Sequence, residues 1–319
     1  MKTGSGFKTM NLTSDFAQHL GQTRVICVGM AALDEIWCVE RRLDGASQKI
    51  RASSYTTAGG GMAATSAFAI AKLGAKASFW GRAGNDAAGA AMRGELSDAG
   101  VDISQFRCFD GGRSSVSAVI VDESGERQIV NFRGAFPEDT AWLPLEQVAG
   151  AAAVLADPRW VAGTVAAFGA ARARGIPTVL DADIADADVF ETLLPMTDHA
   201  IFSEPALRQF AGDDLDAALA KVAAFGCRVA AVTRGQDGIA WLESNLRHDM
   251  AACPVEVVDT TGAGDVFHGA YALALGAGLP TNDAMRFSTA VAALKCTRIG
   301  GRAGIPTLDD MITFLRTSE

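Results

Sequence analysis

The chain has 319 residues, enough for one α/β domain with a small appendage, and 49% of them are hydrophobic. Its 28 basic and 37 acidic residues give a net charge of −9, and no basic cluster is longer than Arg41-Arg42, which excludes a nucleic-acid-binding surface. No apolar run approaches the roughly 18 residues of a membrane span, and residues 1–22 are polar. We therefore expect a cytoplasmic protein with a flexible N-terminal segment at 1–22 and no membrane partner. Six scattered cysteines without CxxC spacing are typical of reduced thiols.

The first strand is predicted at 25–29, an apolar run that ends in glycine, and Asp34 follows it. In an open α/β sheet, an acid after a strand faces the ligand crevice, because that crevice lies at the carboxyl ends of the strands. An aspartate in this position is also a common turn former. The residue alone leaves both interpretations open.

Two parts of the chain, 36–57 and 113–133, predict a small sheet that stands off the main domain. Lys49 lies in a short alternating segment, so we expect it on a strand face. Residues 114–122 and 126–133 indicate two strands about a turn. Such a sheet can pair with a second copy, which predicts a homodimer through this sheet.

Three successive glycines, Gly59, Gly60 and Gly61, precede a helix of small residues that is predicted to run to Lys72. A glycine triplet at a helix start lets the backbone approach another group closely, because no side chain stands in the way. We therefore expect this turn to contact a ligand.

The second half of the chain alternates strands with helices. This pattern predicts parallel strands covered by helices on both faces, which is a three-layer α/β/α domain with a mostly parallel central sheet. A ligand site is expected where the strands end. The predicted segments are 152–156, 160–174, 178–181, 199–203, 214–225 and 229–233.

A glycine-containing turn late in the chain is the most informative stretch. Residues 257–258 are predicted to end a strand, and a helix is predicted from Ala263 to Leu275. Gly262 and Gly264 allow close approach of the backbone. Free N–H groups at the positive end of a helix dipole bind a multiply charged anion, such as a phosphate in transfer. The turn is not a P-loop, since no Gly-Lys-Ser/Thr follows.

Asp265 directly follows this turn. Acids are common in the first turn of a helix, where they interact favourably with the dipole, so the residue needs no function there. A carboxylate beside a phosphate site has a use, however, if it accepts a hydroxyl proton while the amides stabilise the transferring phosphoryl group. Both interpretations remain open on this residue alone.

The run Asp-Thr-Thr-Gly-Ala-Gly-Asp-x-Phe-x-Gly-Ala at 259–270 resembles the second signature of the ribokinase-like (PfkB) carbohydrate kinases, and residues 59–89 resemble the first. The resemblance implies an ATP-dependent sugar kinase that uses Mg²⁺, with the γ-phosphate on the amides of 262–264 and Asp265 as catalytic base. It also implies a ribokinase-like domain with a β-sheet lid over the sugar. The domain is expected at 23–35, 58–112 and 134–319, and the lid at 36–57 and 113–133.

The same resemblance implies further roles. Asp34 and the turn 59–61 would bind the sugar. Glu204 lies where the family has Asn-x-x-Glu, and would reach Mg²⁺ through water; Asp259 would help to hold a monovalent cation such as K⁺. The residues expected near ATP are Thr233, Gly235, Gly238, Gly262 and Gly264.

Finer similarity narrows the substrate. Segments 56–61 and 294–306, among others, resemble the 6-deoxy-6-sulfofructose kinases of sulfoquinovose breakdown, which phosphorylate the C1 hydroxyl. By this resemblance Arg159, Lys49 and Asn131 would contact the sulfonate. Arginine can offer an anion a bidentate fork, whereas lysine offers a point charge. The expected substrate is therefore an anionic sugar.

Other functions stay open. A kinase of fructose 6-phosphate, or of another ketose or ribose-type sugar, would share both signatures. A nucleotide-binding regulator without catalysis is less favoured, because Asp265 is present. A Rossmann dehydrogenase fits least, because the glycine motif lies late in the chain and lacks the usual strand, GxGxxG and helix.

Overall fold

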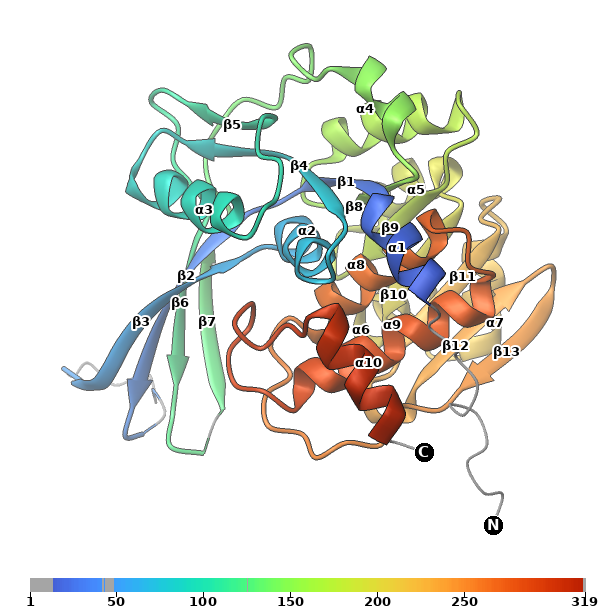
Figure 1. Cartoon of the computed structure of the whole chain (residues 1–319). Helices are drawn as coiled ribbons and strands as arrows, with labels where there is room; N and C mark the ends of the chain where they lie inside the picture. The colour runs from blue at the N-terminus through green and yellow to red at the C-terminus, as the bar shows by residue number, and fades with distance from the viewer. Residues whose placement is uncertain (1–13, 42, 44–48, 125, 318–319) are drawn as a thin grey trace.

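The computed structural model describes residues 14–41, 43, 49–124 and 126–317 (Figure 1). These residues form a large domain around a nine-stranded sheet and a smaller, four-stranded sheet at one side. Among them, no helix is both long enough and apolar enough to cross a membrane.

The nine-stranded sheet has the order β13-β12-β11-β10-β9-β8-β1-β4-β5. Neighbouring strands are parallel except at the β11-β12-β13 edge, where they are antiparallel. In β1, Val25 and Cys27 join one hydrophobic core and Ile26 and Val28 the other, so both faces are covered. The strands are β1 (Arg24–Gly29), β4 (Lys76–Gly84), β5 (Phe106–Phe109), β8 (Ala153–Ala156), β9 (Thr178–Ala182), β10 (His199–Ser203), β11 (Val229–Thr233), β12 (Ile239–Glu243) and β13 (Leu246–Met250).

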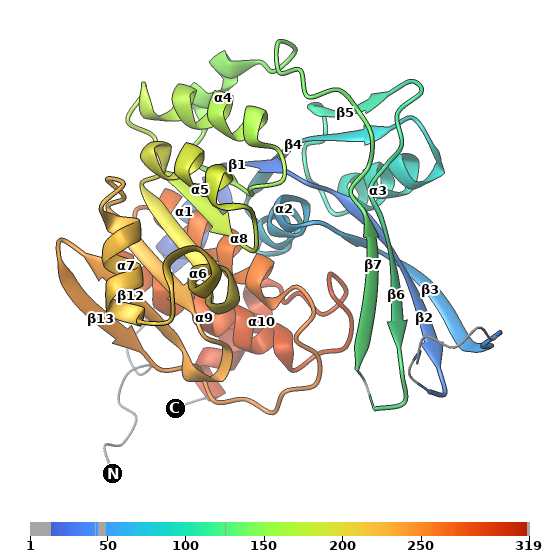
Figure 2. The ribbon, with the colours of Figure 1, turned by 180° about the vertical axis from the view of Figure 1, so that it is seen from behind.

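Helices lie on both faces of this sheet (Figure 2), which confirms the predicted three-layer α/β/α arrangement. One layer contains α4 (Val161–Arg172), α5 (Ala187–Leu193), α6 (Glu204–Ala211) and α7 (Leu215–Ala223). The other contains α1 (Ser14–Gln22), α2 (Met62–Lys72), α3 (Ala87–Asp98), α8 (Ala263–Gly276), α9 (Thr281–Cys296) and α10 (Leu308–Thr317). Short 3-10 helices occur at Leu145–Gly150, Leu194–Met196 and Gly235–Asp237.

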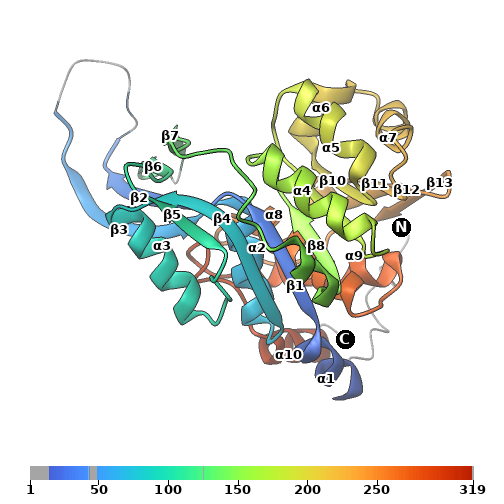
Figure 3. The same cartoon turned by 90° about the horizontal axis from the view of Figure 1, so that it is seen from above.

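The four-stranded sheet, which we call the lid, projects from one side of the large domain (Figure 3). Its order is β3-β2-β6-β7, with β2 and β6 parallel and the outer pairs antiparallel. The small sheet is thus confirmed, although its first two strands continue beyond the predicted 36–57 into the large domain. The strands are β2 (Ala32–Val39), β3 (Ala52–Gly60), β6 (Val116–Val121) and β7 (Arg127–Phe132).

Two local predictions at the chain's N-terminal part are wrong. Lys49 is not on a strand, because β3 begins only at Ala52, and its side chain is exposed in the preceding loop. The segment expected to be flexible up to residue 22 contains α1, whose Leu20 is fully buried in the core. Residues 1–13 lie outside the described part of the chain.

Helix α8 carries the glycine turn and is buried from Val266 to Ala274. It packs closely on α2: a Cβ added at Gly269 would lie 2.6 Å from the backbone oxygen of Ser66. The prediction that a strand ends at residue 258 is wrong. Val257 and Val258 are 59% and 52% exposed, and they pair with no strand in the described chain. A loop therefore leads into α8.

Candidate active site

The start of α8 presents backbone amides from which no described residue accepts a hydrogen bond. Gly262 has φ 72°, a left-handed conformation that favours glycine, and it is the N-cap residue directly before α8. Within the described residues the amides of Gly262, Gly264 and Asp265 have no hydrogen-bond acceptor, whereas that of Ala263 donates to the Thr260 oxygen at 3.1 Å. The amides of 262–264 remain the prediction for the phosphate; of these, Ala263 is bound to Thr260, and the amide of Asp265 is free of an acceptor in the described chain as well. We call residues 262–265 the anion turn.

Asp265 places a carboxylate beside these amides. The side chain is half-buried, and its oxygens accept no hydrogen bond from any described residue. Burial and then the nearby Asp181 carboxylate raise the pKa of Asp265 well above its ordinary value, against the opposing effect of His268. An unpartnered carboxylate with a raised pKa is a stronger base than an ordinary aspartate, so it can accept a proton from a bound hydroxyl.

Acids follow the strands that end near this turn. Asp157, after β8, is fully buried and accepts hydrogen bonds from the amides of Met30, Ala63 and Arg159 at 2.8, 3.1 and 2.8 Å. It therefore holds the start of α2 and the loop after β1 in place. Asp181, at the end of β9, is also buried, and its Oδ2 has no partner in the described chain.

His268 lies one turn beyond Asp265 and packs inside the domain. Its Nδ1 is 2.7 Å from the Gly264 oxygen and 3.3 Å from Asp181 Oδ1, and its Nε2 is 3.1 Å from the Ile201 oxygen. Burial lowers the pKa of His268, against the opposing hydrogen bonds to the two carbonyls. The ring thus joins α8 to the strand ends.

Asp34 lies in the same region, at the base of the lid. A Cβ at Gly60 would lie 2.5 Å from Asp34 Oδ2, so a larger residue there would displace the Asp34 carboxylate. Asp34, Ser117 and Asn131 stand opposite one another on β2, β6 and β7, and Asn131 Nδ2 donates to Ser117 Oγ at 3.1 Å. Burial raises the pKa of Asp34, while Ser117 and Arg302 oppose the shift. These polar groups form one row on one face of the lid.

That face of the lid points towards the anion turn. Arg127 shares the face with Asn131, because the two are four residues apart on β7. Its guanidinium is 2.8 Å from the Asp259 carboxylate, which lies just before the turn. The row of Asp34, Ser117 and Asn131 and the start of α8 therefore face a common space.

Arg302 is a buried cation in this space that sequence reasoning missed. Its guanidinium donates to Glu95 Oε2 at 2.9 Å, to the Gly60 oxygen at 2.8 Å and to Thr65 Oγ1 at 3.3 Å. A Cβ at Gly59 would lie 2.0 Å from it. Asp265 and Asp34 both stabilise its charge. The glycine triplet therefore packs on Arg302 as well as bordering the site. In the sequence, the glycines next to Arg302 are the only sign that its loop lies close to another group.

Arg159 and Lys49 occupy different environments. The Arg159 guanidinium donates to the Ile184 oxygen at 2.8 Å and lies 3.7 Å from Asp183 Oδ2, so it is fixed beside the ends of β8 and β9. Lys49 lies three residues before β3 begins. From Ala52 to Ala58, which pairs with Asp34, β3 covers about 20 Å at roughly 3.3 Å per residue. Lys49 is therefore remote from Asp34 of its own chain.

The expected nucleotide loop follows β11. Thr233 ends the strand, and its hydroxyl donates to the Phe202 oxygen at 3.3 Å. Gly235 and Gly238 have positive φ angles of 54° and 81°. A Cβ at Gly238 would lie 2.0 Å from the Met250 oxygen, so this glycine has a structural reason, while Gly235 borders open space.

Few protein ligands are available for a metal. The Glu204 carboxylate pairs with Arg208 one helical turn away at 2.8 Å. Within the described residues, no three or more His, Cys, Asp or Glu side chains are grouped so that they could hold a metal ion. Any Mg²⁺ here would keep most of its ligands from ATP phosphates and water, which is common for this ion.

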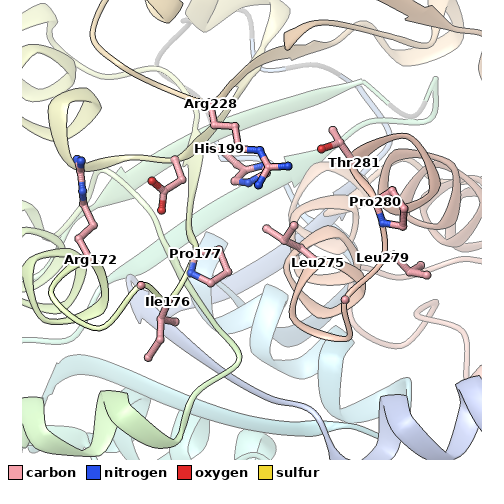
Figure 4. A pocket seen from close by; sticks show the side chains of 12 residues that line it. Arg172, Ile176, Pro177, His199, Arg228, Leu275, Leu279, Pro280 and Thr281 are labelled. Atoms are coloured by element: carbon pink, nitrogen blue, oxygen red, sulfur yellow. The ribbon is translucent and has the colours of Figure 1, made fainter. Parts of the chain in front are cut away.

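A separate cavity of about 670 Å³ lies at the other end of the sheet (Figure 4). Arg172, His199, Arg228 and Thr281 are among its lining residues. His199 begins β10 and Arg228 precedes β11, so the cavity is at the amino ends of the strands. It is distinct from the site built on the anion turn.

Amides that lack an acceptor in the described chain, beside a carboxylate, suit the transfer of an anionic group to a hydroxyl, and the chain is similar to proteins with that chemistry. The chain matches the pfkB family of carbohydrate kinases over residues 22–308. It is 28% identical to the ribokinase of Bacillus subtilis over 299 residues, which are 92% of this chain and 99% of the relative. It is 30% identical to the fructokinase of Klebsiella pneumoniae over 282 residues, 79% of this chain and 90% of the relative.

Solved structures agree as well. A candidate ribokinase from Agrobacterium tumefaciens superposes with a TM-score of 0.87 at 36% identity, covering 93% of this chain and 98% of that one. The ribokinase of Arabidopsis thaliana, complexed with ribose and ATP, superposes with a TM-score of 0.83 at 28% identity, covering 92% and 99%. The protein is thus a phosphotransferase that acts on a hydroxyl group, with a ribokinase-like fold. It belongs to the pfkB family of carbohydrate kinases.

Two glycines of α8 should respond differently to the same substitution. The methyl group of Gly264→Ala meets no atom of the described residues within 4 Å, so stability should hold or rise by up to about 1 kcal/mol. The kcat/KM should fall roughly 100-fold, because the methyl group blocks the amides. Gly269→Ala, the matched control, should cost about 1–3 kcal/mol through its clash with Ser66. Urea unfolding and steady-state kinetics measure both. Full activity of Gly264→Ala would contradict an anion site here.

The pH profile should reveal the raised pKa of Asp265. A base works only when it is deprotonated, so kcat/KM should decline on the acid side around a pKa above the ordinary value of about 4. Asp181→Asn removes a like charge and should move this decline to lower pH. A decline that stays in place or moves to higher pH in Asp181→Asn would show that Asp181 does not act on the base.

Proposed function

We propose that the protein is an ATP-dependent sugar kinase that transfers the γ-phosphate to the C1 hydroxyl of 6-deoxy-6-sulfofructose, giving 6-deoxy-6-sulfofructose 1-phosphate and ADP. One observation carries the kinase assignment: amides at the start of α8 that have no acceptor in the described chain stand beside the Asp265 carboxylate, which accepts no hydrogen bond there. The Arabidopsis relative, crystallised with ribose and ATP, supports the pairing of a sugar with this nucleotide.

In this proposal the amides of Gly262, Gly264 and Asp265 receive the γ-phosphate, with the α8 dipole adding to their positive potential. Asp265 takes the proton of the sugar hydroxyl as its oxygen attacks phosphorus, and ADP leaves with the electrons of the broken P–O bond. Thr233 and Gly235 border the nucleotide. Mg²⁺ would supply charge neutralisation on the phosphates, and Glu204, whose Oε1 is paired with Arg208, would reach it through water.

Sugar binding is assigned to the base of the lid. Asp34 accepts hydrogen bonds from sugar hydroxyls, and the backbone at 59–61 allows the ring to approach closely. Movement of the lid would exclude water from the transfer. Arg127 on the lid pairs with Asp259, which leads into the anion turn, so the position of the lid would affect the position of the turn.

The sulfonate is assigned to Arg159 and Asn131. Arg159 is 17% exposed and fixed by Ile184 and Asp183, so its remaining N–H groups are pre-oriented for an anion. Asn131 would add a neutral donor from the lid by exchanging one of its bonds to Ser117 and Val116 for the sulfonate. A sulfonate carries one negative charge and a phosphate up to two, so a site with few cations favours the sulfonate.

A homodimer through the lid would explain two further observations. The face opposite Asp34 carries Tyr55, Val130 and Phe132, which are 51%, 74% and 44% exposed. Burying this apolar face against a second copy would stabilise the pair. In such a dimer, Lys49, which is remote from its own Asp34, would serve the partner's sugar site.

Ribose and fructose 6-phosphate are the competing substrates. Ribose is favoured by the ribokinases among the relatives, and fructose 6-phosphate by the same cationic residues. Initial rates with sulfofructose, fructose 6-phosphate, fructose and ribose separate these possibilities. The proposal requires the highest kcat/KM for sulfofructose; a preference for ribose would retain the kinase and refute the sulfonated substrate.

Arg159→Ala tests the assignment of the anionic end. Loss of a charge-assisted contact costs about 1.5–3 kcal/mol, so kcat/KM for sulfofructose should fall roughly 10- to 100-fold. Uncharged fructose is the internal control and should lose little. Equal losses for the two sugars would assign Arg159 a structural role through Asp183 instead.

A further inference from the structure

Hydrogen bonds occupy Asp259, the residue that leads into the anion turn. Its carboxylate accepts from the Thr261 amide and hydroxyl at 2.9 and 2.6 Å, from the Gly300 amide at 2.8 Å and from Arg127 at 2.8 Å. Burial opposes ionisation, but the hydrogen bonds from Thr261 and Gly300 and the charge of Lys295 lower the pKa of Asp259. Both carboxylate oxygens therefore face donors.

The end of α9 holds the backbone of Asp259. The Asp259 N–H donates to the Cys296 oxygen at 3.1 Å, and the Asp259 carbonyl accepts from Lys295 Nζ at 2.8 Å. Lys295 is 0% exposed, although lysine is almost never fully buried without a partner. In the described chain, this carbonyl is the sole hydrogen-bond acceptor of the ammonium. Burial lowers the pKa of Lys295, and Asp259 opposes that shift.

A monovalent cation at Asp259, which the family resemblance implies, does not fit this arrangement. Such an ion exchanges its water shell for carbonyl and carboxylate oxygens. Here the carbonyl of Asp259 is bound by an ammonium and its carboxylate by four donors. Lys295 and Arg127 would also repel an added positive charge.

We propose that the Lys295 ammonium replaces the monovalent cation, as a positioning residue that fixes Asp259 and through it the anion turn, so that this kinase needs no K⁺. The ammonium carries the same charge as K⁺ and binds the same kind of oxygen, but it is covalently attached and cannot dissociate. Asp259 is three residues before Gly262, so a shift of its backbone would move the amides that receive the phosphate. The inference rests on the kinase function, not on which sugar is used.

The test compares the whole chain in buffers whose cation is tetramethylammonium, K⁺ or NH₄⁺. Wild-type protein should have equal kcat/KM for ATP in all three. Lys295→Ala removes the charge and leaves a space, so kcat/KM should fall on the order of 10-fold or more in tetramethylammonium and recover in K⁺ or NH₄⁺. Lys295→Met removes the charge but fills the space, so it should lose activity without recovery.

Melting of the ligand-free proteins gives a readout that needs no sugar. K⁺ should raise the melting temperature of Lys295→Ala relative to tetramethylammonium, and should not do so for wild type or Lys295→Met. Lys221→Ala is a matched control, because Lys221 Nζ on α7 also donates to a backbone oxygen, that of Phe210 at 2.6 Å. It should show no specific response to K⁺.

Either of two results would overturn the inference: activation of the wild type by K⁺, or a folded Lys295→Ala variant whose activity and melting ignore the cation. If Lys295→Ala does not fold, the wild-type and Lys295→Met measurements still decide the K⁺ requirement. The protein could phosphorylate none of the sugars while K⁺ still raises the melting temperature of Lys295→Ala. That result would support the replacement of K⁺ by Lys295 and refute the proposed substrate.

Discussion

The proposed chemistry of the site depends on one juxtaposition. Three amides at the start of α8 have no acceptor among the described residues, and they lie beside the Asp265 carboxylate, which accepts no hydrogen bond from those residues. The amides attract a phosphoryl group, and the carboxylate can accept the proton that the incoming hydroxyl loses. Placing an acid beside an anion site is unfavourable unless the acid has a task in the reaction. The burial and the acidic neighbour that raise the pKa of Asp265 make it a better base for that task.

Rigid packing holds this juxtaposition in place. Helix α8 is buried over most of its length and approaches α2 so closely that only glycine fits at position 269. Buried charged groups then fix the surrounding loops: Asp157 binds the amide of Ala63 at the start of α2, and Arg302 binds the glycine triplet. Such groups are costly to bury unless they are hydrogen-bonded, which these are.

The sequence predicted the large-scale fold well, because alternating strands and helices and two glycine-rich signatures are local patterns. It failed where the outcome depends on distant partners. The apolar pair Val257 and Val258 looks like a strand end, yet it pairs with no strand among the described residues. The roles of Arg302 and Lys295 could not be predicted, because their partners are distant in sequence. Arg302 pairs with Glu95, and Lys295 donates to the carbonyl of Asp259. The amide of Ala263 differs from its neighbours only through a turn bond to Thr260.

The most direct test of the central claim is Asp265→Asn, which keeps the shape of the side chain and removes its ability to act as a base. We predict that ATP still binds, with Kd changed by less than about 3-fold, while sugar-dependent turnover of ATP falls roughly 10²- to 10⁴-fold. Calorimetry and a coupled ADP assay on the same preparation give both values. Turnover within a few-fold of the wild type would contradict the assignment of Asp265 as the base and with it the account of the site.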